Sequence, residues 1–160
     1  IAGSQGTMNN FVYGNAHFQN YETICGGTGA GNGFDGTSAV HSHMTNTRMT
    51  DPEVLETRFP VRLEEFSIRK GSGGAGRWRG GDGIVRVLRF LEPATVTLLT
   101  SHRVVPPHGM ACGAPGACGE NWLRLRDGTS VRLGANDHAD LKSGDAVELR
   151  SPGGGGYGSV

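Results

Sequence analysis

The stretch from residue 41 to residue 48 contains the side chains best suited to chemistry. His41 and His43 are two residues apart, so both imidazoles project from the same side of an extended chain, where they could bind a metal ion or an anion. Asn46 and Arg48 follow just before a predicted helix start, where backbone N–H groups favour an anion. We therefore predict that His41, His43, Asn46 and Arg48 bind a substrate carboxylate or phosphate.

The same residues are compatible with other roles. The spacing fixes no third ligand, so no metal site is assigned and His41 and His43 stay candidate metal ligands only. Histidine pairs of this kind also occur as hydrogen-bonded structural residues, and Arg48 could instead pair with Asp51 or Glu56. A structural or interfacial role for the segment therefore remains open.

Two glycine motifs, at residues 31–36 and 71–76, match the G-x-G-x-x-G pattern of dinucleotide-binding proteins. That pattern binds a nucleotide between a strand and a helix, and neither stretch has this setting, so both are predicted to be turns. Cys25 precedes the first motif, and a buried inert thiol is the favoured interpretation because no base is placed beside it. The sequence thus predicts no cofactor-binding residue.

Composition excludes several classes of protein. The 160 residues carry 15 Lys and Arg against 15 Asp and Glu, and a chain of zero net charge lacks the basic footprint of a nucleic-acid module. The arginines are scattered through the predicted strands and form no basic run. No apolar run reaches the length of a membrane span. The three cysteines form no CxxC pair, which favours a reducing cytoplasm over a disulfide framework. Because the chain begins at Ile1 inside a polar stretch, we expect it to be a piece of a longer polypeptide.

Local signals predict one short helix. Thr50 and Glu53 have capping-box spacing, and Pro52 suits the first turn of a helix. This helix is expected to end near Phe59, because Pro60 disfavours the helical conformation in the residue before it.

The other predicted elements are strands. The apolar phase of residues 61–68 changes at Glu64–Glu65, which predicts a β-bulge, and Asp127–Gly128 predicts a tight hairpin. Further strands are expected at residues 11–13, 21–25, 84–91, 95–100, 121–126, 129–133 and 146–150. The predicted fold class is α+β, mostly β. It has a Gly-rich segment over residues 1–70 with one short helix, then a small antiparallel β-domain over residues 71–160, barrel-like or a sandwich.

Longer strings in the chain resemble one protein family. They are similar to the hydantoinase B/5-oxoprolinase family, in the order expected for the C-terminal segment of its B-type region, and they cover essentially the whole chain. The strings are Ser4–Asn10, Tyr21–Ala30, His41–Arg48, Asp51–Glu56, Gly71–Gly83 and Ser151–Gly158. Residues 14–17 and 41–51 resemble single-chain, ATP-hydrolysing 5-oxoprolinases more than separate hydantoinase B proteins.

The resemblance implies the ATP-dependent opening of a cyclic amide. The reaction would be the hydrolysis of 5-oxo-L-proline to L-glutamate in the glutathione (γ-glutamyl) cycle, with ATP needed because an unstrained lactam is a poor electrophile. It also implies that ATP and Mg²⁺ bind the full-length enzyme outside this segment, and that the metal motifs of the B-type region lie upstream of it. The segment alone is therefore expected to be inactive, and no catalytic residue is carried across.

The implied partners are the rest of the parent chain or a hydantoinase A-type subunit, a small cyclic amide substrate, and further copies of the full enzyme in a homo-oligomer. We expect a cytoplasmic protein with no nucleic-acid or membrane partner. Two alternatives remain. One is the B-type component of an N-methylhydantoinase-type cyclic amide hydrolase, and the other is a non-catalytic structural or oligomerisation module.

Overall fold

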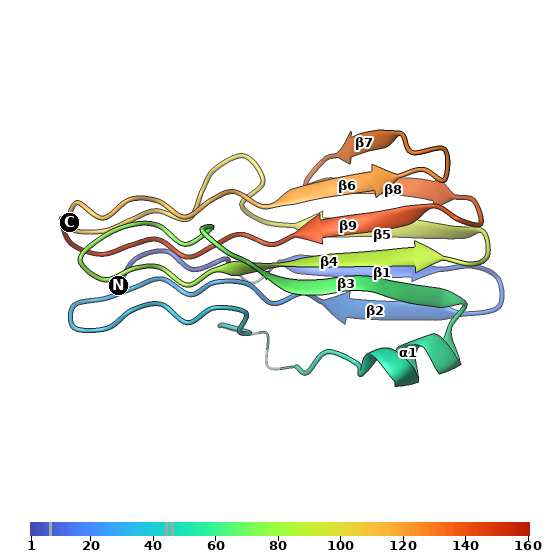
Figure 1. Cartoon of the computed structure of the whole chain (residues 1–160), viewed down its shortest axis with the longest axis horizontal. Coiled ribbons are helices and arrows are strands. Elements are labelled where there is room, and N and C mark those ends of the chain that lie inside the picture. The colour runs from blue at the N-terminus through green and yellow to red at the C-terminus, as the bar shows by residue number, and fades with distance from the viewer. Residues whose placement is uncertain (7, 44, 46) are drawn as a thin grey trace.

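The computed structural model describes residues 1–6, 8–43, 45 and 47–160. Two antiparallel sheets occupy one end of the molecule, and long extended segments occupy the other (Figure 1). The elements are β1 (Asn9–Gly14), β2 (Gln19–Thr23), α1 (Pro52–Arg58), β3 (Val61–Arg69), β4 (Gly83–Phe90), β5 (Ala94–Thr100), β6 (Glu120–Arg124), β7 (Ser130–Leu133), β8 (Asn136–Leu141) and β9 (Ala146–Arg150). The predicted fold class, mostly β with one short helix, is confirmed for the described residues.

The two sheets share one core and form a sandwich, not a closed barrel. Their strand orders are β2-β1-β5-β8 and β3-β4-β9-β6-β7. Apolar side chains of both sheets meet between them, and the rings of Tyr13 on β1 and Phe90 on β4 lie 5.3 Å apart, edge to face. β1 pairs with β5 and β3 pairs with β4, so each sheet takes strands from both sides of residue 70.

The helix begins and ends close to the predicted residues. α1 covers Pro52–Arg58 and Phe59 is its C-cap, as expected from the proline that follows. The expected cap at Thr50 is wrong, because the carboxylate of Asp51 accepts the N–H of Glu53 at 3.0 Å and so caps the helix.

Two further local predictions are confirmed in the five-stranded sheet. The register between β3 and β4 shifts between Leu63 and Glu65, which is the predicted bulge. β6 and β7 form the predicted hairpin, with Gly128 at a φ of +90°. The bulge matters because it returns Phe66 to the inner face, where its ring lies over the guanidinium of Arg86 at 5.7 Å.

The strand β8 has no counterpart among the sequence predictions. Its sequence, Asn-Asp-His-Ala-Asp-Leu, is too polar to show a strand pattern. It forms an edge strand on β5, where only Leu141 is buried. An edge strand with one buried residue needs little apolar alternation, and this explains the missing signal.

The other end of the molecule is a bundle of extended segments, which we call the glycine bundle. It consists of residues 1–6, 26–38, 71–82, 105–119 and 151–158, and it contains all but five of the 28 glycines. The segments run away from the sheets, and both chain ends lie at the far end of the bundle (Figure 1). Backbone hydrogen bonds between segments distant in the sequence hold it together.

The last glycine run of the chain is the centre of the bundle. The N–H groups of Gly153 and Gly156 both donate to the segment 114–117, at 3.3 and 2.9 Å, whereas those of Gly154 and Gly155 donate to two other segments at 2.8 Å. In a β-strand the hydrogen bonds alternate between two neighbours. Here the hydrogen bonds reach the same neighbouring segment again after three residues. This spacing indicates the threefold winding of polyproline II and collagen chains.

Glycine is required in this bundle for close approach. A Cβ on Gly154 would collide with the carbonyl oxygen of Thr28, and one on Gly27 would collide with that of Gly81. The turn predicted within residues 31–36 is present at Asn32–Gly33. Most glycines on either side of such turns serve packing, as in collagen, where only glycine fits at the crowded axis.

Candidate functional site

The predicted site lies on the segment 39–51, which connects the glycine bundle to α1. The segment is anchored to the bundle by Val40, whose N–H donates to the carbonyl of Gly26 at 2.9 Å, with the reverse bond at 3.3 Å. From there it continues to the helix cap at Asp51, next to the edge strand β2. It therefore lies at the border between bundle and sandwich.

The two predicted histidines have different surroundings. The Nε2 atom of His43 lies 2.5 Å from the hydroxyl of Ser4 in the bundle, and His43 has a φ of +59°. The ring nitrogens of His41 are buried and have no hydrogen-bond partner among the described residues. Burial lowers the pKa of His41, so its neutral form is favoured. Among these contacts, none joins the two imidazoles.

Arg48 is the predicted residue that lines a cavity. The cavity measures about 150 Å³ and lies between β2 and residues 47–50, with Tyr21, Glu22 and Thr23 on its other side. Asn46, the fourth predicted residue, lies outside the described residues, as does Met44. The structure thus places Arg48 on a cavity and His43 on a bundle contact.

The described residues offer no metal site of the usual kind. They include no group of three or more His, Cys, Asp or Glu side chains placed to hold a metal ion. Cys25 is 4% exposed, and burial raises the pKa of its thiol, which disfavours the nucleophilic thiolate.

A buried ion pair lies behind the Arg48 cavity. Arg86 donates from Nε and Nη2 to the two carboxylate oxygens of Glu22, at 3.0 Å each, and both side chains are almost fully buried. Tyr13 donates its hydroxyl hydrogen to Glu22 at 3.3 Å, and the hydroxyl oxygen of Tyr13 accepts from the side-chain amide of Asn20 at 2.7 Å. Burial and the Glu22 carboxylate raise the pKa of Tyr13, so this phenol stays protonated. The strand positions alone did not indicate this network.

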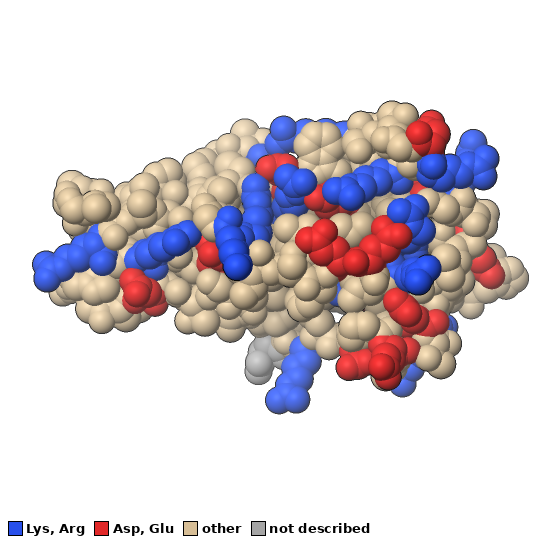
Figure 2. Space-filling view, in the orientation of Figure 1, with Lys and Arg blue, Asp and Glu red and all other residues tan. Residues whose placement is uncertain are grey.

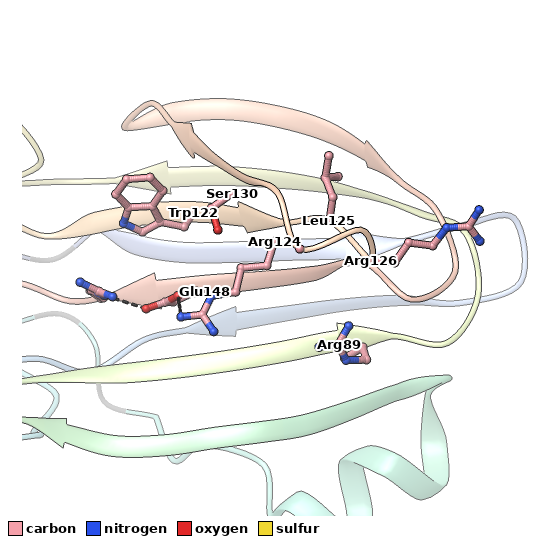
Figure 3. Close-up of a pocket in the computed structure, with 9 residues that line it drawn as sticks. Arg89, Trp122, Arg124, Leu125, Arg126, Ser130 and Glu148 are labelled. Atoms are coloured by element: carbon pink, nitrogen blue, oxygen red, sulfur yellow. Dashed lines mark hydrogen bonds and ion pairs between the residues drawn. The ribbon is translucent and has the colours of Figure 1, made fainter.

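The outer face of the five-stranded sheet carries a second feature that sequence reasoning missed. A hollow of about 520 Å³ is lined by Arg89, Arg124, Arg126 and Arg150 together with Trp122 (Figure 3). These arginines look scattered in the sequence, because Arg89, Arg124 and Arg150 lie on three different strands and Arg126 lies in the turn after β6. Only the sheet register brings them side by side.

Most of these arginines already form ion pairs with carboxylates. Arg124 and Arg150 both pair with Glu148, which is 2% exposed (Figure 3). Arg89 makes a two-bond pair with Glu64. Basic and acidic side chains are accordingly intermixed over this face (Figure 2). The hollow is therefore an ion-pair network and not a uniform basic patch.

Among the described residues, no helix has the length and apolar character needed to cross a membrane.

Comparison with known proteins places the chain in a family. The family model described as hydantoinase B/oxoprolinase matches residues 1–160, and the chain belongs to this family. It is 47% identical over 98% of its length to 5-oxoprolinase 1 of Arabidopsis thaliana and 45% identical over 98% to 5-oxoprolinase of Dictyostelium discoideum. It is also 32% identical over 91% of its length to the B-type component of a D-/L-hydantoinase from a Pseudomonas species, of which it spans 25%.

Solved structures show the same fold. The chain is similar to ATP-dependent caprolactamase from Pseudomonas jessenii, with a TM-score of 0.79 and 25% identity over 99% of this chain and 30% of the other. It matches acetone carboxylase with a TM-score of 0.78 at 18% identity, over 97% of this chain and 26% of the other, which shows the fold alone. The chain spans only 12% of the length of the two 5-oxoprolinases above.

Proposed function

We propose that the longer protein to which this chain corresponds hydrolyses 5-oxo-L-proline to L-glutamate, coupled to ATP hydrolysis, in the cytoplasm and within the glutathione cycle. The observation that carries the proposal is the 45–47% identity to proteins named 5-oxoprolinase across 98% of this chain. The hydantoinase relative supports cyclic amide hydrolysis as the shared chemistry, at the lower identity of 32%. An N-methylhydantoinase-type substrate is therefore the second candidate.

Neither glycine motif is followed by the helix of a nucleotide cradle, and the described residues include no group of three or more His, Cys, Asp or Glu side chains placed to hold a metal ion. Gly36 and Gly73 belong to the two glycine motifs, but the space that a Cβ would fill at each is occupied by backbone, the carbonyl oxygens of Thr28 and Gly80. Gly36 and Gly73 therefore leave no room for a phosphate group, whereas Gly33 and Gly71 of the same motifs face open space. We therefore assign nucleotide and Mg²⁺ binding to parts of the longer protein outside these residues, with the rest of the chain or an A-type subunit as the partner.

Within that protein, we propose that segment 39–51 forms a wall of the substrate site. Arg48 has its side chain on a cavity beside β2, where a guanidinium could bind the substrate carboxylate. His43 holds the segment against the bundle through Ser4, and the ring nitrogens of His41 are buried. The proposed roles of the three described residues thus differ, with Arg48 facing the ligand and the histidines supporting the segment.

The experiment measures L-glutamate formed from 5-oxo-L-proline and ADP released, with the longer protein and with the isolated 160-residue chain. We expect turnover by the longer protein and none by the isolated chain. If the longer protein releases no glutamate but opens a hydantoin, the second candidate replaces the first. Turnover by the isolated chain would overturn the assignment of ATP to other parts of the protein.

Arg48→Gln tests the wall separately. We expect KM for 5-oxo-L-proline to rise at least tenfold with assembly unchanged in sedimentation, because one charge-assisted hydrogen bond to the carboxylate is lost. Arg58→Gln, at the exposed end of α1, is the matched control and should leave KM unchanged. Equal KM values for Arg48→Gln and the control would leave segment 39–51 a purely structural element.

A further inference from the structure

Arg103 is a largely buried cation whose contacts are all neutral. It follows β5 at the border between sandwich and glycine bundle. Its Nε atom donates to Asn121 Oδ1 at 3.0 Å, and its Nη1 atom donates to Asn9 Oδ1 at 2.8 Å and to the carbonyl of Ser101 at 2.7 Å. No carboxylate of the described residues lies within ion-pair distance, and the undescribed positions are Thr7, Met44 and Asn46, which carry no charge.

A cation in this position is energetically unusual. Charged groups removed from water are normally paired, since the cost of desolvation is otherwise not offset. Burial lowers the pKa of Arg103 to about 10; the nearby charge of Arg69 acts in the same direction, and the carboxylate of Glu120 acts in the opposite direction without overcoming burial. The surrounding amides are fixed, because Asn9 and Asn121 are each 1% exposed. The site is therefore a charged group held by fixed amide and carbonyl acceptors, with no ion-pair partner among the described residues.

Other arginines in the protein differ in this respect. Arg86, which is more deeply buried than Arg103, pairs with the carboxylate of Glu22, and the arginines in the hollow of Figure 3 that point at Glu148 pair with that carboxylate. Glu120, the acidic side chain that lines the same cavity as Arg103, is already bound. It accepts from Arg69 at 2.9 Å and from the indole N–H of Trp122 at 2.9 Å. Arg103 thus lacks the partner that comparable arginines have.

A cavity adjoins this guanidinium. It measures about 230 Å³, and its walls include Arg103, Arg132, Glu120 and the backbone of residues 133–135. Gly119 forms another part of the wall, and a Cβ there would collide with the Arg103 guanidinium. The volume is below the usual range of about 300–1,000 Å³ for drug-sized ligands, so it suits a small group.

We propose that this cavity binds a small oxyanion, a carboxylate or phosphate group, with Arg103 as its charge partner and Arg132 at its exposed side. Three oxygens accept from Nε and Nη1 of Arg103, so the guanidinium is fixed and its two Nη2 N–H groups remain to donate to an anion. Bound anion would supply the charge that this part of the structure lacks. The site is independent of the proposed lactam hydrolysis and of segment 39–51.

The test uses the 160-residue chain with inorganic phosphate and, separately, acetate, at constant ionic strength balanced with chloride. The Nε–H resonance of Arg103 is followed by NMR, and the unfolding temperature is measured in parallel. We expect a saturable shift of this resonance and a rise in unfolding temperature with at least one of the two anions. A response that does not saturate with either anion would overturn the proposal.

Variants separate a built site from a general salt effect. Arg103→Gln is expected to abolish the saturable rise in unfolding temperature, whereas Arg89→Gln, which removes an arginine already paired with Glu64, should retain it. Arg132→Gln alters an exposed side chain and carries little folding risk, so it remains informative if Arg103→Gln does not fold. It should weaken anion binding at least threefold. The assignment is contradicted if both variants respond to the anion as the unmodified protein does. If Arg103→Gln is unfolded, unchanged binding in Arg132→Gln alone contradicts it.

Discussion

The glycine bundle and the β-sandwich are stabilised by different parts of the chain. In the sandwich, side chains such as Phe11, Val96 and Leu98 are buried between two sheets and exclude water from the core. In the bundle, the centre at residues 153–156 is buried and has no side chains at all, and its contacts are backbone hydrogen bonds to surrounding segments. One region therefore depends on apolar area and the other on close approach of backbones.

This difference changes which substitutions each region tolerates. A sandwich core loses stability when a side chain is made smaller, because a cavity remains. The bundle is sensitive in the opposite direction, since most of its glycines lie where even one methyl group would meet a backbone carbonyl of a neighbouring segment. The high glycine content of the chain is thus a packing requirement of one region and not a sign of flexibility.

The largest effect is expected for Gly154→Ala at the centre of the bundle. Its Cβ would collide with the carbonyl oxygen of Thr28, and the backbone there is held by a hydrogen bond between Gly154 and Gly81. We expect a loss of more than about 4 kcal/mol in the free energy of unfolding, measured by urea denaturation, or failure to fold.

Gly134→Ala is the matched control for this substitution. In the sandwich, a Cβ at residue 134 would lie 3.5 Å from the nearest atom, an oxygen of the Asp137 side chain. We expect a change within about 1 kcal/mol. Similar losses for the two variants would show that glycine in the bundle is not selected for close packing.

A smaller but still large effect is expected for Arg86→Met inside the sandwich. The substitution leaves the buried carboxylate of Glu22 without its two hydrogen bonds from Arg86. Breaking a buried pair in this way typically costs about 3–5 kcal/mol, measured by urea denaturation. The double variant Arg86→Met/Glu22→Gln removes both charges and should recover at least about 1 kcal/mol. A single-variant cost below about 1 kcal/mol would mean that the pair does not stabilise the sandwich.

Local signals in the sequence predicted much of the sandwich and little of the bundle. Pro60 ends the helix, Glu64–Glu65 forms a bulge and Asp127–Gly128 forms a hairpin, because each of these depends on a few neighbouring residues. The polar strand β8 was missed, since its pairing with β5 replaces any apolar alternation of its own.

The bundle depends on contacts between segments that are far apart in the sequence. The partners of Gly154 and Gly155 are residues 81 and 3, and no local pattern indicates such pairs. The candidate site shows the same limit. Arg48 was identified from a polar run, whereas Arg103 follows an ordinary-looking Ser-His and becomes notable only through burial beside Asn9 and Asn121.

The smallest effect is expected at the border of the two regions, where His41 follows the bridge between Val40 and Gly26. Burial lowers the pKa of His41 below its ordinary value of about 6.5. As the pH falls through that value, the unfolded chain therefore takes up a proton before the folded chain does, and the folded state loses stability.

We expect the free energy of unfolding to decrease from pH 7 to pH 5 more steeply in the unmodified protein than in His41→Gln. His17→Gln removes a histidine at a solvent-exposed position and should keep the steeper dependence. Identical slopes in all three proteins would mean that the border segment opens at no cost, so that His41 is exposed to water before the two regions unfold.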